Sequence, residues 1–212
     1  PGAGWNLVAQ RGDTPEIDYG RIVNTVIDML RPVPTHIELR GLPTSIFEGV
    51  NAQLQVIAHF NNGNTQDVTS QVAYVVDPVA AGTVNASGRF TAASALSADT
   101  DAQVRAVYTF GDGDTLEDVA ATTVRRILPV SVAVSGAASV NEGTNSTYTA
   151  QVTYNNGTTA AAGAAGRVWG VSSAALGTIT TGGVFSAAQV DANVSGNITM
   201  NYTERGVTVS GQ

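Results

Sequence analysis

The sequence lacks cysteine and lysine, and few of its residues carry charge of either sign. Without cysteine, none of the 212 residues can form a disulfide, a thiolate metal site or a cysteine nucleophile. Without lysine, the chain has neither a Schiff-base residue nor the lysine of a phosphate-binding loop. The net charge of −7 opposes nucleic-acid binding, because a nucleic-acid backbone is itself negative. No apolar run approaches the roughly 18 to 20 residues of a membrane-spanning helix, so membrane insertion is not expected.

The abundant residues favour short strands and turns. A hydrophobic content of 43% is enough for packed cores, whereas 13% charged residues is little for long surface helices. Alanine, glycine, threonine, valine, serine and asparagine dominate, and this composition predicts an all-β fold. No serine lies in a Gly-x-Ser-x-Gly elbow, and no pattern assembles a nucleophile or a cofactor site. We therefore expect a non-enzymatic protein without a cofactor.

A repeat with a period near 94 residues divides the chain. The segment Phe60-Asn61-Asn62-Gly63 returns as Tyr154-Asn155-Asn156-Gly157, and Glu48-Gly49 returns as Glu142-Gly143. A period of this length corresponds to a whole small domain, so the sequence predicts two copies of one domain after an N-terminal arm. The expected parts are the arm at 1–33, the first repeat at 34–127 and the second repeat at 128–212.

Each repeat contains a segment in which apolar and polar side chains alternate. The apolar positions are Leu54, Val56, Ala58 and Phe60 in the first repeat, and Tyr148, Ala150, Val152 and Tyr154 in the second. A period of two predicts strands that bury one face. Both segments run into Asn-Asn-Gly, which tolerates the positive φ angles of a tight hairpin. Short strands closely separated by turns favour a β-sandwich.

Both repeats also carry a set of short motifs. In the second repeat these are Trp169-Gly170-Val171-Ser172-Ser173, Gly177-Thr178-Ile179 and Gly183-Val184-Phe185-Ser186-Ala187. The looser first copy has Tyr74-Val75-Val76-Asp77, Gly82-Thr83-Val84 and Gly88-Arg89-Phe90-Thr91-Ala92. Together they resemble the bacterial immunoglobulin-like domain of group 2 over residues 35–210. The resemblance implies two tandem immunoglobulin-like β-sandwiches of the kind found in bacterial surface adhesins and in tailed-phage virion proteins.

The resemblance further implies a core role for four aromatic residues: Tyr74, Phe90, Trp169 and Phe185. The family places a buried tryptophan at the position of Trp169, and Tyr74 is its counterpart in the first repeat. If Trp169 is core, replacing it by alanine should cost about 3 to 5 kcal/mol of stability. The alternative is a platform on which a sugar ring stacks.

Residues 1–33 show a helical pattern instead of strand alternation. An apolar i, i+1, i+4, i+5, i+8 stripe follows Asp18, a suitable N-cap, and ends before Arg31-Pro32. A helix of about 13 residues is marginal alone in water, so its stripe must be buried. Either it covers the first repeat or, in the interpretation we favour, it docks on another subunit. The residues of this anchoring stripe are Ile22, Val23, Val26, Ile27 and Leu30.

Three further patterns could each mark a binding site or could simply be surface residues. Acidic residues gather between positions 99 and 118, where they resemble a set of calcium ligands but do not fit the EF-hand spacing. For them we expect a solvated acidic loop without metal. His36 and His59 have no predicted partners for a zinc site and are expected at the surface. Arg11-Gly12-Asp13 matches the tripeptide that integrins recognise, although a solvated turn is the expected role. The acidic residues are Asp99, Asp101, Asp112, Asp114, Glu117 and Asp118.

These patterns together predict a structural protein of a tailed-phage virion, such as a capsid decoration protein or head fibre, present in many copies. Residues 1–33 would bind a capsid or tail protein, and the two domains would make weak multivalent contacts with host-surface glycans. Their like net charge would discourage self-association when crowded. The alternative is a spacer or binding module of a surface adhesin, which would place the chain on the bacterial cell surface.

Overall fold

The computed structural model describes residues 31–212 with the exception of residue 112. The anchoring stripe, from Ile22 to Leu30, and the Arg11-Gly12-Asp13 tripeptide lie outside the described residues. The expected helix of the arm is therefore untested.

The described chain is all-β, as the composition predicts, and its only helical elements are four 3₁₀ turns of three residues each. Strands of the first repeat form three sheets, in the orders β1-β4-β5, β2-β10-β9-β6 and β3-β8-β7. Their bounds are β1 Pro34–Arg40, β2 Ser45–Phe47, β3 Asn51–Gln53, β4 Gln55–Phe60, β5 Thr65–Asp67, β6 Val72–Asp77, β7 Gly82–Val84, β8 Arg89–Ala92, β9 Thr100–Phe110 and β10 Asp114–Arg125.

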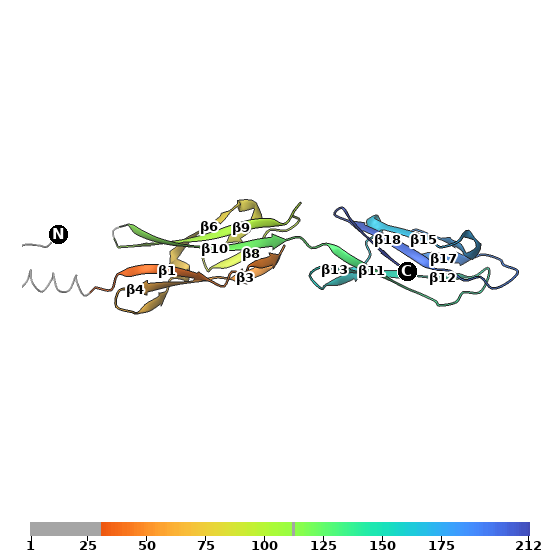
Figure 1. Cartoon of the computed structure of the whole chain (residues 1–212), viewed down its shortest axis with the longest axis horizontal. Helices are drawn as coiled ribbons and strands as arrows, with labels where there is room; N and C mark the ends of the chain where they lie inside the picture. The colour runs from red at the N-terminus through yellow and green to blue at the C-terminus, as the bar shows by residue number, and fades with distance from the viewer. Residues whose placement is uncertain (1–30, 112) are drawn as a thin grey trace, which may run out of the picture.

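The second repeat forms corresponding sheets, in the orders β11-β13-β14, β15-β18-β19 and β12-β17-β16. Its strands are β11 Pro129–Ser135, β12 Asn145–Thr147, β13 Thr149–Tyr154, β14 Thr159–Ala161, β15 Arg167–Val171, β16 Gly177–Ile179, β17 Val184–Ala187, β18 Ile198–Glu204 and β19 Val207–Gly211. No strand pairing crosses from one repeat to the other within the described chain. Figure 1 shows the two repeats lying end to end.

Each repeat buries its own hydrophobic core. Val56 and Ala58 on β4 are fully buried, as the alternation of this segment predicts, and they pack in a cluster with Phe90 and Val104. A separate cluster in the second repeat includes Val152. Sheets on either side of such a core fit a β-sandwich.

The Asn-Asn-Gly segments form the predicted hairpin turns. Gly63 connects β4 to β5 with φ 83°, and Gly157 connects β13 to β14 with φ 82°. The Phe60 carbonyl accepts the Gly63 N–H at 3.0 Å, and the Tyr154 carbonyl accepts the Gly157 N–H at 2.9 Å. Glycine is required because these φ angles strain residues with a Cβ.

The four aromatic residues expected in the core do not all lie there. Phe90 and Phe185 are buried, at 0% and 6% exposure. Tyr74 and Trp169 occupy equivalent positions on β6 and β15, but both are only partly buried and pack on the margin of their cores. Tyr74 reaches the carbonyl of Thr69 with its hydroxyl, at 3.0 Å. Trp169 therefore packs against its core as expected, but its ring is only partly buried.

Replacing Trp169 by alanine should lower the free energy of unfolding by about 2 kcal/mol, less than a fully buried tryptophan would lose. Part of the ring already contacts water, so less apolar surface is lost from the interior. Chemical denaturation followed by circular dichroism measures this, since the substitution removes the fluorophore. Val168→Ala is the control, because the Val168 side chain is 64% exposed and should change stability by less than about 0.5 kcal/mol. Equal effects of the two substitutions would contradict a packing role for Trp169.

Candidate functional site: the joint between the two repeats

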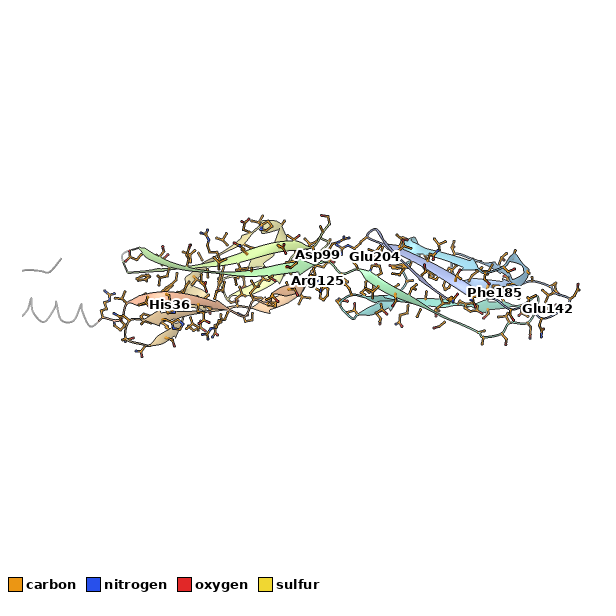
Figure 2. The ribbon with its side chains drawn as sticks, in the orientation of Figure 1. His36, Asp99, Arg125, Glu142, Phe185 and Glu204 are labelled. Atoms are coloured by element: carbon orange, nitrogen blue, oxygen red, sulfur yellow. The ribbon has the colours of Figure 1, made fainter. Side chains whose placement is uncertain are left out.

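The two repeats are connected by a short linker, Arg126-Ile127-Leu128, between the end of β10 and the start of β11. Side chains from both repeats converge on this linker. Figure 2 shows Asp99 and Arg125 of the first repeat near Glu204 of the second, between the two groups of strands. We call this region the joint.

Glu48 is the centre of the joint. It directly follows β2, and its backbone N–H donates to the Arg125 carbonyl at 2.8 Å. Its carboxylate accepts hydrogen bonds from two backbone N–H groups, that of Ile127 at 2.8 Å and that of Leu96 at 3.0 Å. The side chain is only 6% exposed. A buried carboxylate needs such partners, because an unpaired buried charge is costly.

Arg205 of the second repeat supplies the positive charge. It lies with Gly206 in the two-residue turn between β18 and β19, and both residues have positive φ angles, 50° and 82°. Positive φ at both central positions is typical of a type I′ hairpin. The guanidinium pairs with both carboxylate oxygens of Glu48, with Nη2 at 3.1 Å from Oε2. It also donates to the carbonyls of Leu96 and Ile127.

The linker is held by hydrogen bonds from both sides. The Arg126 N–H donates to Asp99 of the first repeat at 2.8 Å, and its guanidinium donates to the Arg205 carbonyl at 3.0 Å. Asn155 of the second repeat accepts the Leu128 N–H at 3.1 Å and donates its own N–H to the Leu128 carbonyl at 3.0 Å. All three linker N–H groups therefore have protein partners, and the three residues are partly buried.

The joint lowers the pKa of the Glu48 carboxyl from its ordinary 4.5 to about 2. Burial by itself would raise this pKa, because it penalises the charged form. The hydrogen bond from Arg205 and those from the N–H groups of Ile127 and Leu96 outweigh burial. The same pairing raises the pKa of Arg205. Both groups are therefore charged at neutral pH.

A second hydrogen-bonded cluster supports the turn that carries Arg205. The hydroxyls of Tyr154 and Tyr202 both donate to Oε2 of Glu204, at 2.8 and 2.9 Å. Burial, followed by these hydrogen bonds, raises the pKa of Tyr154. The tyrosines thereby fix the residue that precedes Arg205.

Four of the six acidic residues between positions 99 and 118 lie on strands: Asp101 on β9, and Asp114, Glu117 and Asp118 on β10. Asp99 precedes β9, and Asp112 lies outside the described residues. Asp118 accepts the Leu39 N–H at 2.7 Å, and Asp101 accepts the Thr123 hydroxyl at 2.7 Å. The expectation of a loop is wrong for these four residues, because they lie on the two strands of a long hairpin, but three of them are exposed to solvent as expected. Within residues 31–111 and 113–212, no three His, Asp or Glu side chains are placed to hold a metal ion.

The two histidines lie side by side, which the sequence analysis missed. His36 on β1 pairs directly with His59 on β4, and their rings stack with centroids 4.3 Å apart. His59 also lies 3.4 Å from the Glu38 carboxylate. His36 is exposed and His59 is partly buried. Strand register brought them together, and register is not visible in the spacing of two isolated residues.

Sequence reasoning also missed the joint. In the sequence, Glu48-Gly49 marks the repeat, because it recurs as Glu142-Gly143, but nothing there indicates a contact between the repeats. The residue type alone does not show that Glu48 is buried, because most glutamates lie at the surface. Its partner Arg205 is 157 positions away in the sequence. One pattern in the sequence could have indicated the joint. Arg205-Gly206 suits a tight hairpin turn, and such a turn places the arginine side chain at the tip of the hairpin.

The joint consists of an ion pair and backbone hydrogen bonds that connect the two repeats. No helix in the described part of the chain is long and apolar enough to cross a membrane.

Comparisons with known proteins give distant structural similarity only. No protein-family model matches the chain, and no curated protein matches it. Among solved structures, "Structure of surface layer protein SbsC, domains 1-6" aligns with a TM-score of 0.47 and 14% identity, over 85% of this chain and 28% of that one. "Crystal structure of the S-layer protein SbsC domains 4 and 5" aligns with a TM-score of 0.44 and 15% identity, over 84% and 97% of the two chains. Our chain thus spans little more than a quarter of the longer SbsC structure.

Proposed function

We propose that this protein is a non-enzymatic structural protein in which two immunoglobulin-like domains, residues 34–127 and 128–212, form one stiff rod. The observation that carries the proposal is the joint, where Arg205 of one domain pairs with the buried Glu48 of the other. A rod of this kind holds its far end at a fixed distance and angle from its attachment point.

Stiffness follows from the hydrogen bonding of the linker. A flexible connection leaves backbone groups free to exchange between water partners, whereas Arg126, Ile127 and Leu128 each donate their N–H to a protein acceptor. Bending the joint would break the ion pair of Glu48 and Arg205 and leave a desolvated carboxylate. Breaking a buried pair typically costs about 3 to 5 kcal/mol, so bent states would be rare.

The rod-like arrangement leads to a direct test. The chain has no cysteine, so Thr65→Cys and Thr159→Cys place two spin labels at equivalent exposed positions on β5 and β14. Pulsed electron resonance should give a narrow distance distribution between the labels. Arg205→Ala should broaden it, because the ion pair is lost, while Arg89→Ala, an exposed arginine on β8, should leave it unchanged. A distribution that is broad before any substitution would contradict the proposal.

We place this rod in the virion of a tailed phage, as a capsid decoration protein or head fibre in many copies. Residues 1–33 serve as the anchor on a capsid or tail protein, because their apolar stripe needs burial. The net charge of −7 keeps neighbouring copies apart, and display in many copies permits weak multivalent contact with host-surface glycans.

Removing residues 1–33 should abolish incorporation into particles without unfolding the two domains. Mass spectrometry of purified virions measures incorporation, and circular dichroism of the purified truncated protein measures folding. Absence of the full chain from every particle would contradict the virion placement but would leave the rod proposal standing.

A second candidate is a spacer of a bacterial surface adhesin. The observation in its favour is that Glu142, at the far end of the second repeat, accepts the Val190 N–H as Glu48 in the joint accepts the Leu96 N–H. This likeness suits an array of domains joined in the same way. Detection of the protein on intact bacterial cells by surface labelling, with none in phage particles, would decide for this candidate.

A further inference from the structure

The far end of the second repeat copies the Glu48 side of the joint. Glu142 lies 94 positions after Glu48, and its carboxylate accepts the Val190 N–H at 3.1 Å, as Glu48 accepts the Leu96 N–H at 3.0 Å. The two acceptor–donor pairs have the same separation of 48 residues. Glu142 thus presents the same carboxylate geometry at the opposite end of the second repeat (Figure 2).

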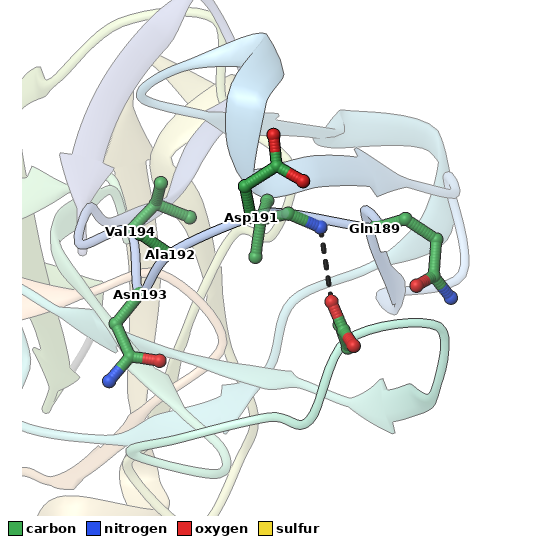
Figure 3. Close-up of a pocket in the computed structure, with 7 residues that line it drawn as sticks. Gln189, Asp191, Ala192, Asn193 and Val194 are labelled. Carbon is green, nitrogen blue, oxygen red and sulfur yellow. Dashed lines mark hydrogen bonds between the residues drawn. The ribbon is translucent and has the colours of Figure 1, made fainter.

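Glu142 differs from Glu48 in its exposure to solvent and in its partners. Glu142 is exposed, whereas Glu48 is buried and holds both Arg205 and the Ile127 N–H. Glu142 lines a hollow of about 580 Å³ together with residues 189–194. Figure 3 shows Gln189, Asp191 and Val194 among the residues around this hollow, and its dashed line marks the hydrogen bond from the Val190 N–H to Glu142. Asp191 also lines this hollow, so its charge is negative.

β19 corresponds to the first part of β10, because Gly211 pairs with Met200 as Asp118 pairs with Ala106. In the first repeat, the last residues of β10, Thr123 to Arg125, pair with β2 and cover that strand.

Apolar side chains near Glu142 are in contact with water. Ile46 on β2 is 7% exposed, but its counterpart Val140 lies outside any strand and is only partly buried. Val194, on the rim of the hollow, is 46% exposed. An extended backbone and an arginine would complete this surface as they complete it around Glu48.

We propose that this end of the second repeat is a docking surface for a further immunoglobulin-like domain, which inserts an arginine from a hairpin turn against Glu142 and lays an extended linker beside it. The existing joint defines what the docking domain must supply. It needs an arginine at the tip of a hairpin, a backbone N–H that donates to the second carboxylate oxygen of Glu142, and an extended segment that pairs with residues 139–141. The negative hollow complements the arginine.

A second copy of this chain does not have these features at its leading end. The turn between β9 and β10 in the first repeat reads Gly111-Asp112-Gly113 in the sequence, so it contains no arginine where the second repeat has Arg205. The linker position equivalent to Ile127 is Pro32, since Val33 exchanges with Asn61 the hydrogen bonds that Leu128 exchanges with Asn155. Proline has no N–H to donate. The docking domain therefore differs from the first repeat.

The proposal is tested by extending the full chain after Gln212 with a second copy of residues 120–212. The extension supplies the strand, the linker and an arginine turn that the first joint already uses. Spin labels at Thr159→Cys and at the same position of the appended copy measure the new joint, and labels at Thr65→Cys and Thr159→Cys measure the existing one. We expect the two joints to give the same narrow distance distribution.

Two substitutions in the extended chain decide the outcome. Glu142→Gln and, separately, alanine at the appended copy's Arg205 should each abolish the narrow distribution of the new joint and leave the existing joint unchanged. Circular dichroism melts separate loss of docking from loss of folding. A broad distribution in the unsubstituted extension, or a narrow one that neither substitution changes, would overturn the proposal. Neither result depends on whether the protein belongs to a virion.

Discussion

Replacing Glu48 by glutamine should lower the free energy of unfolding of the first repeat by about 3 kcal/mol. The amide cannot accept hydrogen bonds with both of its polar atoms, so one of the N–H groups of Leu96 and Ile127 loses its partner. Arg205 also loses its counter-charge. The expected loss lies at the low end for a broken buried pair, because the Arg205 side chain retains 24% of its exposure to water.

The chain offers a matched control at the equivalent position of the other repeat. Glu142→Gln removes the same charge from a carboxylate that also accepts one backbone N–H, that of Val190, but among the described residues no arginine pairs with Glu142. It should change stability by less than about 1 kcal/mol. Urea unfolding followed by circular dichroism reports both repeats, whereas tryptophan fluorescence does not report the first, which has no tryptophan. Equal effects of the two substitutions would show that the joint contributes nothing beyond a surface carboxylate.

Acid should weaken the protein through the same residue. A carboxyl whose pKa is lowered on folding stabilises the folded state above its unfolded pKa, and this contribution disappears as pH falls through the folded pKa. For Glu48 the window runs from 4.5 down to about 2, and the contribution lost across it is about 3 kcal/mol. The first repeat should therefore unfold in less urea at pH 2.5 than at pH 6.

Glu48→Gln isolates this contribution from those of other carboxylates. The pKa of Glu38 is lowered by Arg40, and that of Asp67 by Thr69 and Gln55, so some acid sensitivity will remain in the variant. The difference in stability between the unsubstituted protein and the variant should be largest near pH 6 and should shrink toward pH 2. A difference that stays constant with pH would mean that the Glu48 carboxyl titrates alike in both states.

The joint also explains why the two repeats are not interchangeable. The turn between β18 and β19 carries Arg205, whereas the sequence between β9 and β10, residues 111–113, contains no arginine. Of these two turns, only the one in the second repeat can therefore supply a guanidinium to a carboxylate.

Local patterns in the sequence determined the strands, the turns and the repeat. The alternation around Val56 and Val152 determined which face of each strand is buried, because side chains of a strand point alternately to opposite faces. Asn-Gly determined two hairpins, because glycine alone adopts their positive φ without strain. These features depend on neighbours a few positions apart, so they are readable without coordinates.

Only the tertiary structure decided which distant residues meet. It paired His36 with His59, placed four of the acidic residues on β9 and β10, and placed Trp169 at the margin of its core. It also brought Arg205 to Glu48 and left Glu142 open. The physical reason is that strand register and the packing of one repeat on another depend on the whole set of sheets, and no short stretch of sequence contains that information.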